Sequence, residues 1–140
     1  MRNKELGFTI PELLVTLFVL VTAFISFTTL FVAIDSVSTK NKLLLDANAS
    51  AYAKIQEYEN KDFANIPTGS TCDNGSKTNE VEDFSASLPS SLFEPKTGKV
   101  YVVSVTQSLK LICVEVSYRD NSGSRLIEYA DFIHESGYGR

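Results

Sequence analysis

The strongest constraint on this sequence is a run from Leu13 to Ile34 that contains no charged residue. A bilayer core is about 30 Å thick and is crossed by about 20 apolar residues in helical form, so the run is long enough to span a membrane. One acid, Glu12, stands directly before it. The chain has 140 residues, which leaves room for one small domain besides this segment. We therefore expect two parts, a helical anchor and a small domain outside the bilayer.

The apolar run differs from the core of a cleaved secretory signal, which has roughly 7–15 apolar residues before a small-residue cleavage site. Here the run is longer and ends at the polar stretch "DSVSTK". This favours a retained signal anchor over an ordinary signal peptide. The flanking charges do not decide the orientation. Arg2 and Lys4 precede the span, and they are balanced by Lys40 and Lys42 after it.

The chain contains no Gly or Pro between Pro11 and Pro67, so we expect one helix from about Phe8 to about Asn60. At 1.5 Å per residue such a helix is on the order of 80 Å long, too long to be buried in a domain of this size. In its second half, residues 35–64, apolar residues recur at spacings of three and four, which predicts one apolar face. The residues of this face are Leu44, Ala47, Ala51, Ile55 and Tyr58.

The next segment, residues 65–98, is rich in Pro, Gly, Ser and Thr, so we expect a connecting loop with little regular structure. Residues 99–140 contain three runs of β-branched and aromatic residues separated by short polar stretches. These runs predict a three-stranded antiparallel sheet followed by a C-terminal tail. In the middle run, apolar residues alternate with mostly polar ones, which indicates one apolar face. The apolar positions are Ile112, Val114, Val116 and Tyr118. We expect this face to cover the helix, giving an α+β fold.

The two cysteines of the chain, Cys72 and Cys113, lie in the predicted loop and in the predicted middle strand. Outside the membrane an even pair usually forms a disulfide, and closing this loop contributes about 4 kcal/mol in the chain-entropy model. The alternative is two unrelated thiols. A small sheet with a long loop has a meagre core that needs such a crosslink, which favours the disulfide.

The sequence predicts no enzyme, because it has one His, no Gly-rich phosphate loop and no acids paired at a fixed spacing. Two isolated cysteines and the distant His134 are a poor metal site, so we expect neither a metal nor a cofactor. The net charge is -4 and Lys and Arg form no block, so a nucleic-acid partner is possible but not indicated. We expect His134 at the surface.

Residues 4–27, "KELGFTIPELLVTLFVLVTAFISF", resemble the N-terminus of type IV prepilins and type II secretion pseudopilins. The shared features are a short basic leader ending in Gly7, an aromatic Phe8, and Glu12 at the fifth position after Gly7, followed by an apolar helix. The predicted order of elements also resembles the pilin fold, a long N-terminal helix packed on a small antiparallel sheet. Weaker similarity extends to "AYAKIQEYENKDFANI" and "VEVSYRDNSGSRLIEYADFI", which resemble the helix end and the last two strands of minor pilins.

The resemblance implies that a prepilin peptidase removes the leader, residues 1–7, by cutting between Gly7 and Phe8. Residues 8–34 are then the transmembrane and assembly half of the helix. The resemblance also implies that Glu12 and Phe8 act in assembly, where Glu12 reaches the Phe8 amine of a neighbouring subunit.

The function implied is that of a minor-pilin-like structural subunit of a type IV pilus or a related filament. The implied partners are other pilin subunits, the prepilin peptidase, the pilus assembly machinery and the membrane. The chain would sit in the inner or cytoplasmic membrane with its C-terminal domain outside, and then enter a cell-surface or periplasmic filament. The alternative is a single-pass membrane-anchored protein with a small extracytoplasmic binding domain that forms no filament.

Overall fold

The computed structural model describes residues 9–73 and 76–137. One long helix, α1 (Ile10–Glu59), packs on antiparallel sheets, which confirms the predicted α+β class. The chain divides between Thr39 and Lys40 into two compact units. The first half of α1 makes up the described part of the N-terminal unit, and the C-terminal unit contains the rest of α1 and all the strands.

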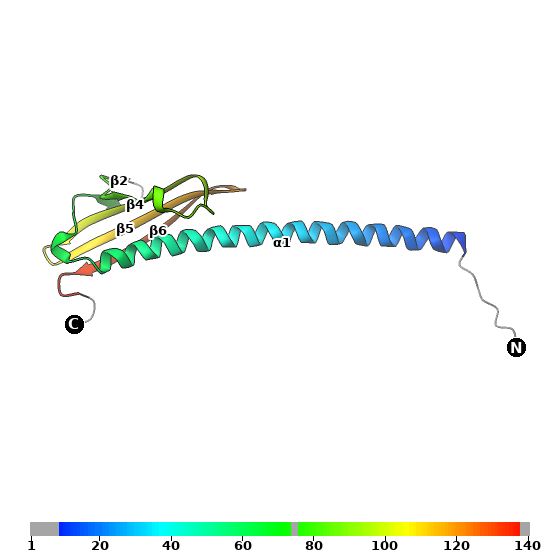
Figure 1. The fold of residues 1–140 in the computed structure, drawn as a ribbon, viewed down its shortest axis with the longest axis horizontal. Helices are drawn as coiled ribbons and strands as arrows, with labels where there is room; N and C mark the ends of the chain where they lie inside the picture. Colours follow the sequence, from blue (N-terminus) through cyan, green and yellow to red (C-terminus); the bar gives the residue numbers. More distant parts are fainter. Residues whose placement is uncertain (1–8, 74–75, 138–140) are drawn as a thin grey trace. The chain divides into compact units, whose positions relative to one another are not determined.

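The C-terminal unit is built on a four-stranded antiparallel sheet in the order β3-β4-β5-β6 (Figure 1). The long strands run consecutively as a meander, with two-residue connections between them. They are β4 (Phe93–Thr106), β5 (Leu109–Asp120) and β6 (Gly123–His134). The short strand β3 (Glu82–Asp83) adds to the outer edge of β4. A separate hairpin joins β1 (Thr71–Asp73) to β2 (Ser76–Thr78), and two 3-10 turns, η1 (Phe63–Asn65) and η2 (Ser85–Ser87), complete the unit.

The sheet has one strand more than predicted, and its first long strand begins six residues before the expected start at Lys99. The segment "FEPKTG" does not predict this extension, because Pro95 and Gly98 are typical of loops. The ladder between β4 and β5 shifts register between Phe93 and Thr97, so a bulge accommodates Pro95. Segment 65–98 therefore carries three short strands, a 3-10 turn and the beginning of β4, besides its loops.

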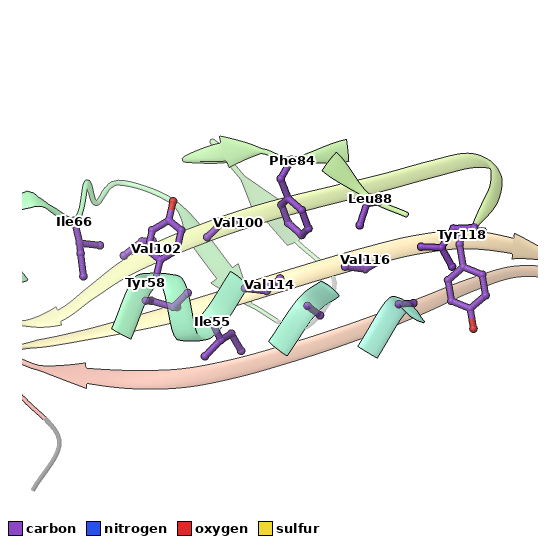
Figure 2. Close-up of a cluster of buried hydrophobic side chains, with 14 of the residues drawn as sticks. Ile55, Tyr58, Ile66, Phe84, Leu88, Val100, Val102, Val114, Val116 and Tyr118 are labelled. Atoms are coloured by element: carbon purple, nitrogen blue, oxygen red, sulfur yellow. The ribbon is translucent and has the colours of Figure 1, made fainter. Parts of the chain in front are cut away.

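The core lies between α1 and one face of the sheet (Figure 2). The predicted apolar face of the middle strand is confirmed, because Ile112, Val114 and Val116 are fully buried and Tyr118 nearly so. Period-two alternation places all four on one side of β5. Residues from the preceding loops close the sides of this core: Ile66, Phe84, Leu88 and Leu92.

The helix contributes Leu43 to this core rather than the predicted Leu44, which is 45% exposed. Both leucines fit a helical spacing with Ala47, so the pattern alone does not separate them. The buried stripe is completed as predicted by Ala47, Ala51, Ile55 and Tyr58. Ala47 and Ala51 have no exposed surface, and their small side chains let the helix lie close to the sheet.

Candidate functional site

The apolar half of α1 is exposed along its whole described length. Large apolar side chains between Ile10 and Ile34 are exposed by 46% at Val21 and by up to 80% at Ile10. Within the described part of the chain, α1 is the one helix long and apolar enough to cross a membrane, and nothing in the structure buries its apolar window. The arrangement fits a single-pass membrane anchor followed by a C-terminal domain.

The hydroxyl groups inside the uncharged run are all bonded to backbone carbonyls of their own helix. Thr16 donates to the Leu13 carbonyl at 2.9 Å, and Thr28 donates to the Phe24 carbonyl at 2.8 Å. The same pattern holds for the remaining hydroxyls, Thr22, Ser26 and Thr29. An unsatisfied polar group costs several kcal/mol in hydrocarbon, so this internal bonding makes the run compatible with lipid.

Glu12 lies in the first turn of α1 and is the acidic residue there. The helix begins with Leu13 N–H bonded to the Thr9 carbonyl at 3.1 Å, so the carboxylate stands near the unpaired N–H groups of the helix start. Over residues 9–73 and 76–137, no cation lies within ion-pair distance of Glu12. The predicted cleavage position, Gly7 and Phe8, lies outside the described residues.

The structure joins Cys72 in β1 to Cys113 in β5 by a disulfide, with the two Cα atoms 6.5 Å apart. The β1–β2 hairpin is thereby tied to the sheet face opposite the helix. Lys77 in β2 strengthens this attachment, because its ammonium lies 2.9 Å from Glu115 and also pairs with Glu128. The sequence predicted the cysteine pair but not Lys77, since no spacing in the loop marks a cross-sheet ion pair.

A charged cluster joins the second half of α1 to β3. Lys54 Nζ lies 2.5 Å from one Glu82 oxygen, and Tyr58 donates to the other at 2.8 Å. Burial works to raise the pKa of Glu82, but the hydrogen bonds from Lys54 and Tyr58 outweigh it and hold that pKa below its usual value. The pKa of Tyr58 is raised, first by burial and then by Glu82. Glu82 was missed by sequence reasoning because β3 has only two residues.

Lys110 is a buried cation on the helix-facing side of β5. Its ammonium donates to the Phe63 carbonyl at 2.5 Å and to the Ile66 carbonyl at 2.9 Å, and lies 4.2 Å from the centre of the Phe63 ring. These contacts hold the turn after α1 against the sheet. The alternation of β5 contained a signal for it, because Lys110 precedes the buried Ile112 by two positions and thus shares its face.

Across the described residues, no group of three or more His, Cys, Asp or Glu side chains is placed to hold a metal ion. His134 is exposed near the end of β6, as predicted, and its Nδ1 lies 2.7 Å from Ser136 Oγ. Glu59 lies in the last turn of α1, and burial and then the neighbouring Asp131 of β6 raise the pKa of Glu59.

The structure therefore leaves the apolar half of α1, with Glu12 in its first turn, as the candidate functional surface. The charged clusters of the C-terminal unit hold its elements together. No protein-family model, curated protein or solved structure matches the chain.

Proposed function

We propose that this chain is a minor-pilin-like structural subunit of a type IV pilus or a related filament, anchored in the membrane before assembly. In this proposal it is not an enzyme. Its work is to pack its N-terminal helix against the helices of other subunits. Its C-terminal unit decorates or caps the filament.

The single observation that supports this most is the exposed apolar half of α1 with Glu12 at its start. So much exposed apolar surface requires either lipid or other apolar helices around it. A plain anchor needs the apolar run alone. Glu12, at the N-terminal end of the run, adds a carboxylate whose burial in an apolar environment costs free energy when it has no ion-pair partner.

Cleavage after Gly7 supplies the missing cation. The new α-amino group at Phe8 would be a cation four residues before Glu12, and the leader would carry away Arg2, Lys4 and Glu5. The net charge of the mature chain then moves from -4 to -5. In the filament, Glu12 of one subunit pairs with the Phe8 amine of a neighbour, which selects one axial register.

The test expresses the chain in cells that possess a prepilin peptidase and reads the mature N-terminus by intact mass. A start at Phe8 and recovery in sheared filaments are expected. The variant Gly7→Val should remain uncut and stay in the membrane fraction, whereas Asn3→Ala, also in the leader, should be processed normally. A start at Met1 or Arg2 in a stable membrane protein would support the single-pass binding protein instead.

A further inference from the structure

One end of the C-terminal unit carries basic side chains on α1, β5 and β6. Lys40 of α1 donates to Ser122 Oγ at 2.7 Å, which fixes the β5–β6 turn beside the beginning of this unit. Arg119 and Arg125 flank the turn, and Lys42 lies on the helix two residues after Lys40.

This end is close in sequence to the C-terminal end of the apolar run. Lys40 follows Ile34 by six residues of continuous helix, or about 9 Å at 1.5 Å per residue. The headgroup layer on each side of a bilayer is roughly 5–8 Å thick, because the whole bilayer is about 40–45 Å across and its core about 30 Å. When the run spans the membrane, Lys40 therefore stands at the outer edge of the headgroup layer, within reach of the headgroups through a long basic side chain.

The charged groups named at this end carry a net charge of only +1, counting Lys96 with the four cations, whereas the whole chain carries -4. The acid in its centre is Asp120, which is buried and occupied by two donors, Arg125 Nε at 2.9 Å and Ser122 N–H at 2.6 Å. Arg125 is the cation that neutralises this carboxylate, which leaves Lys40, Lys42 and Arg119 as the other basic groups of this end. The other acids in the neighbourhood are Asp35, which is exposed before Lys40, Asp46, which accepts from Ser91, and Glu94, which lies 3.9 Å from Lys96.

An aromatic side chain completes the surface. Phe93 is 48% exposed and pairs in register with Arg119 across β4 and β5. Both line an open hollow of about 490 Å³ with Asn121 and Ser122 of the turn. A ring beside an exposed guanidinium group is a combination that anchors proteins at a membrane interface, where the ring enters the upper acyl region and the cation remains among the headgroups.

We propose that this basic end, formed by Lys40, Lys42, Phe93, Arg119 and Arg125, binds anionic lipid headgroups of the membrane that holds the chain. The inference rests on the anchoring part of the proposed function and not on filament formation. Each basic residue near an anionic surface raises the association on the order of fivefold, and the span supplies a high local concentration of lipid. The contact orients the C-terminal unit on the bilayer before assembly.

The test uses the full chain with Phe93→Trp, because the sequence contains no other Trp. The protein is reconstituted into phosphatidylcholine vesicles with or without phosphatidylglycerol, and the fluorescence is quenched by lipids brominated near the headgroup end of the acyl chain. Strong quenching is expected only with phosphatidylglycerol, and high salt should weaken it. Replacing Lys42 and Arg119 by Gln in this background should weaken the association roughly 25-fold. Both side chains are exposed, so an unchanged thermal melt should show that the fold is intact.

The matched control places the Trp at Phe132, which is 51% exposed and pairs with Leu111 towards the other end of the same sheet. Little quenching is expected there. Equal quenching at both positions, or quenching at position 93 that ignores phosphatidylglycerol and the two Gln substitutions, would overturn the inference while leaving the anchor in place. Failure of every variant to float with vesicles after alkaline extraction would refute the anchor itself, and the inference with it.

Discussion

The Tyr58 hydroxyl donates a 2.8 Å hydrogen bond to Glu82, and this contact joins the last turns of α1 to the edge strand β3. Lys54 holds the other oxygen of the same carboxylate. A strand of two residues has few ladder hydrogen bonds of its own, so these side-chain contacts fix the edge of the sheet against the helix.

We predict that Glu82→Gln lowers the free energy of unfolding at pH 7 by up to about 1 kcal/mol, since the site is partly exposed to solvent. The pKa of Glu82 is lower in the folded chain than its usual value, so its contribution is full above the unfolded pKa and is lost as the pH falls through the folded pKa. Thermal unfolding of the full chain in detergent, followed by the near-ultraviolet signal of the tyrosines, should show the two proteins converging below about pH 4. Glu80→Gln, at an exposed carboxylate 3.4 Å from Lys99, serves as the control, and an equal effect there would contradict the prediction.

The contribution of Glu59 to stability should depend on pH in the opposite direction to that of Glu82. Its pKa is raised by burial and by Asp131, so the folded state favours the protonated form. The associated stability is full below the unfolded pKa and is lost as the pH rises through the raised folded pKa. We expect Glu59→Gln to stabilise the fold at neutral pH by less than about 1 kcal/mol and to have no effect at low pH. A destabilised variant at pH 7 in the same thermal measurement would refute this.

Gly98 lies directly beneath the ring of Phe84, and a Cβ atom at this position would come within 2.7 Å of that ring. Phe84 is buried, so the ring cannot move aside freely. We predict that Gly98→Ala destabilises the chain by about 1–3 kcal/mol, the usual cost of overpacking. In chemical denaturation, Gly98→Ala should cost less free energy of unfolding in a Phe84→Leu background than in the unchanged chain. Additive effects of the two changes would show that the ring is not the cause.

The arrangement of a long helix on an antiparallel sheet could be predicted from the sequence because two periodicities are strong. The helical spacing from Ala47 to Tyr58 and the alternation from Ile112 to Tyr118 both mark the buried faces. The predictions that were wrong concern local features. The extension of β4 through Pro95 depends on a bulge, and the choice of Leu43 over Leu44 depends on how the helix lies on the sheet, which neither spacing contains.

The candidate site also has a part that the sequence predicts and a part that it does not. The exposed apolar run and Glu12 follow from composition alone, because lipid-compatible length and a lone charge are properties of the linear sequence. The ion pairs of Lys77 and Lys54 could not be predicted, since each joins segments far apart in the chain. A short hairpin and a two-residue strand carry too few residues for a periodic signal.

Reduction of the Cys72–Cys113 disulfide should loosen the β1–β2 hairpin and spare the helix. The closed loop separates the cysteines by 41 positions, so the crosslink contributes about 4 kcal/mol in the chain-entropy model. We expect the double variant Cys72→Ser, Cys113→Ser to have a free energy of unfolding lower by about this amount. Faster amide exchange should be confined to segment 65–83, and α1 should keep its helical circular dichroism. Two titratable thiols in purified, unreduced protein would show that the bond is absent.

The last prediction concerns Glu12, whose carboxylate has no cation within ion-pair distance in the described part of the chain. The helix N-terminus alone stabilises such a charge by roughly 0.3–1 kcal/mol. A charged side chain at the centre of a bilayer costs about 2.5–3.5 kcal/mol on insertion scales, and less near the interface, so a nearby amine contributes further.

We expect Glu12→Ala to be processed and inserted normally but to enter filaments poorly, because the register contact with the Phe8 amine of a neighbour is lost. Glu12→Asp should rescue incorporation only in part, since its shorter stem places the carboxylate farther from that amine. The ratio of the protein in sheared filaments to that in membranes measures the effect, and Thr16→Val, which removes a hydroxyl bonded within the same helix, is the control. Efficient incorporation of the Ala variant would reduce Glu12 to a helix-capping charge, because an assembly contact that can be deleted without loss does not set the register.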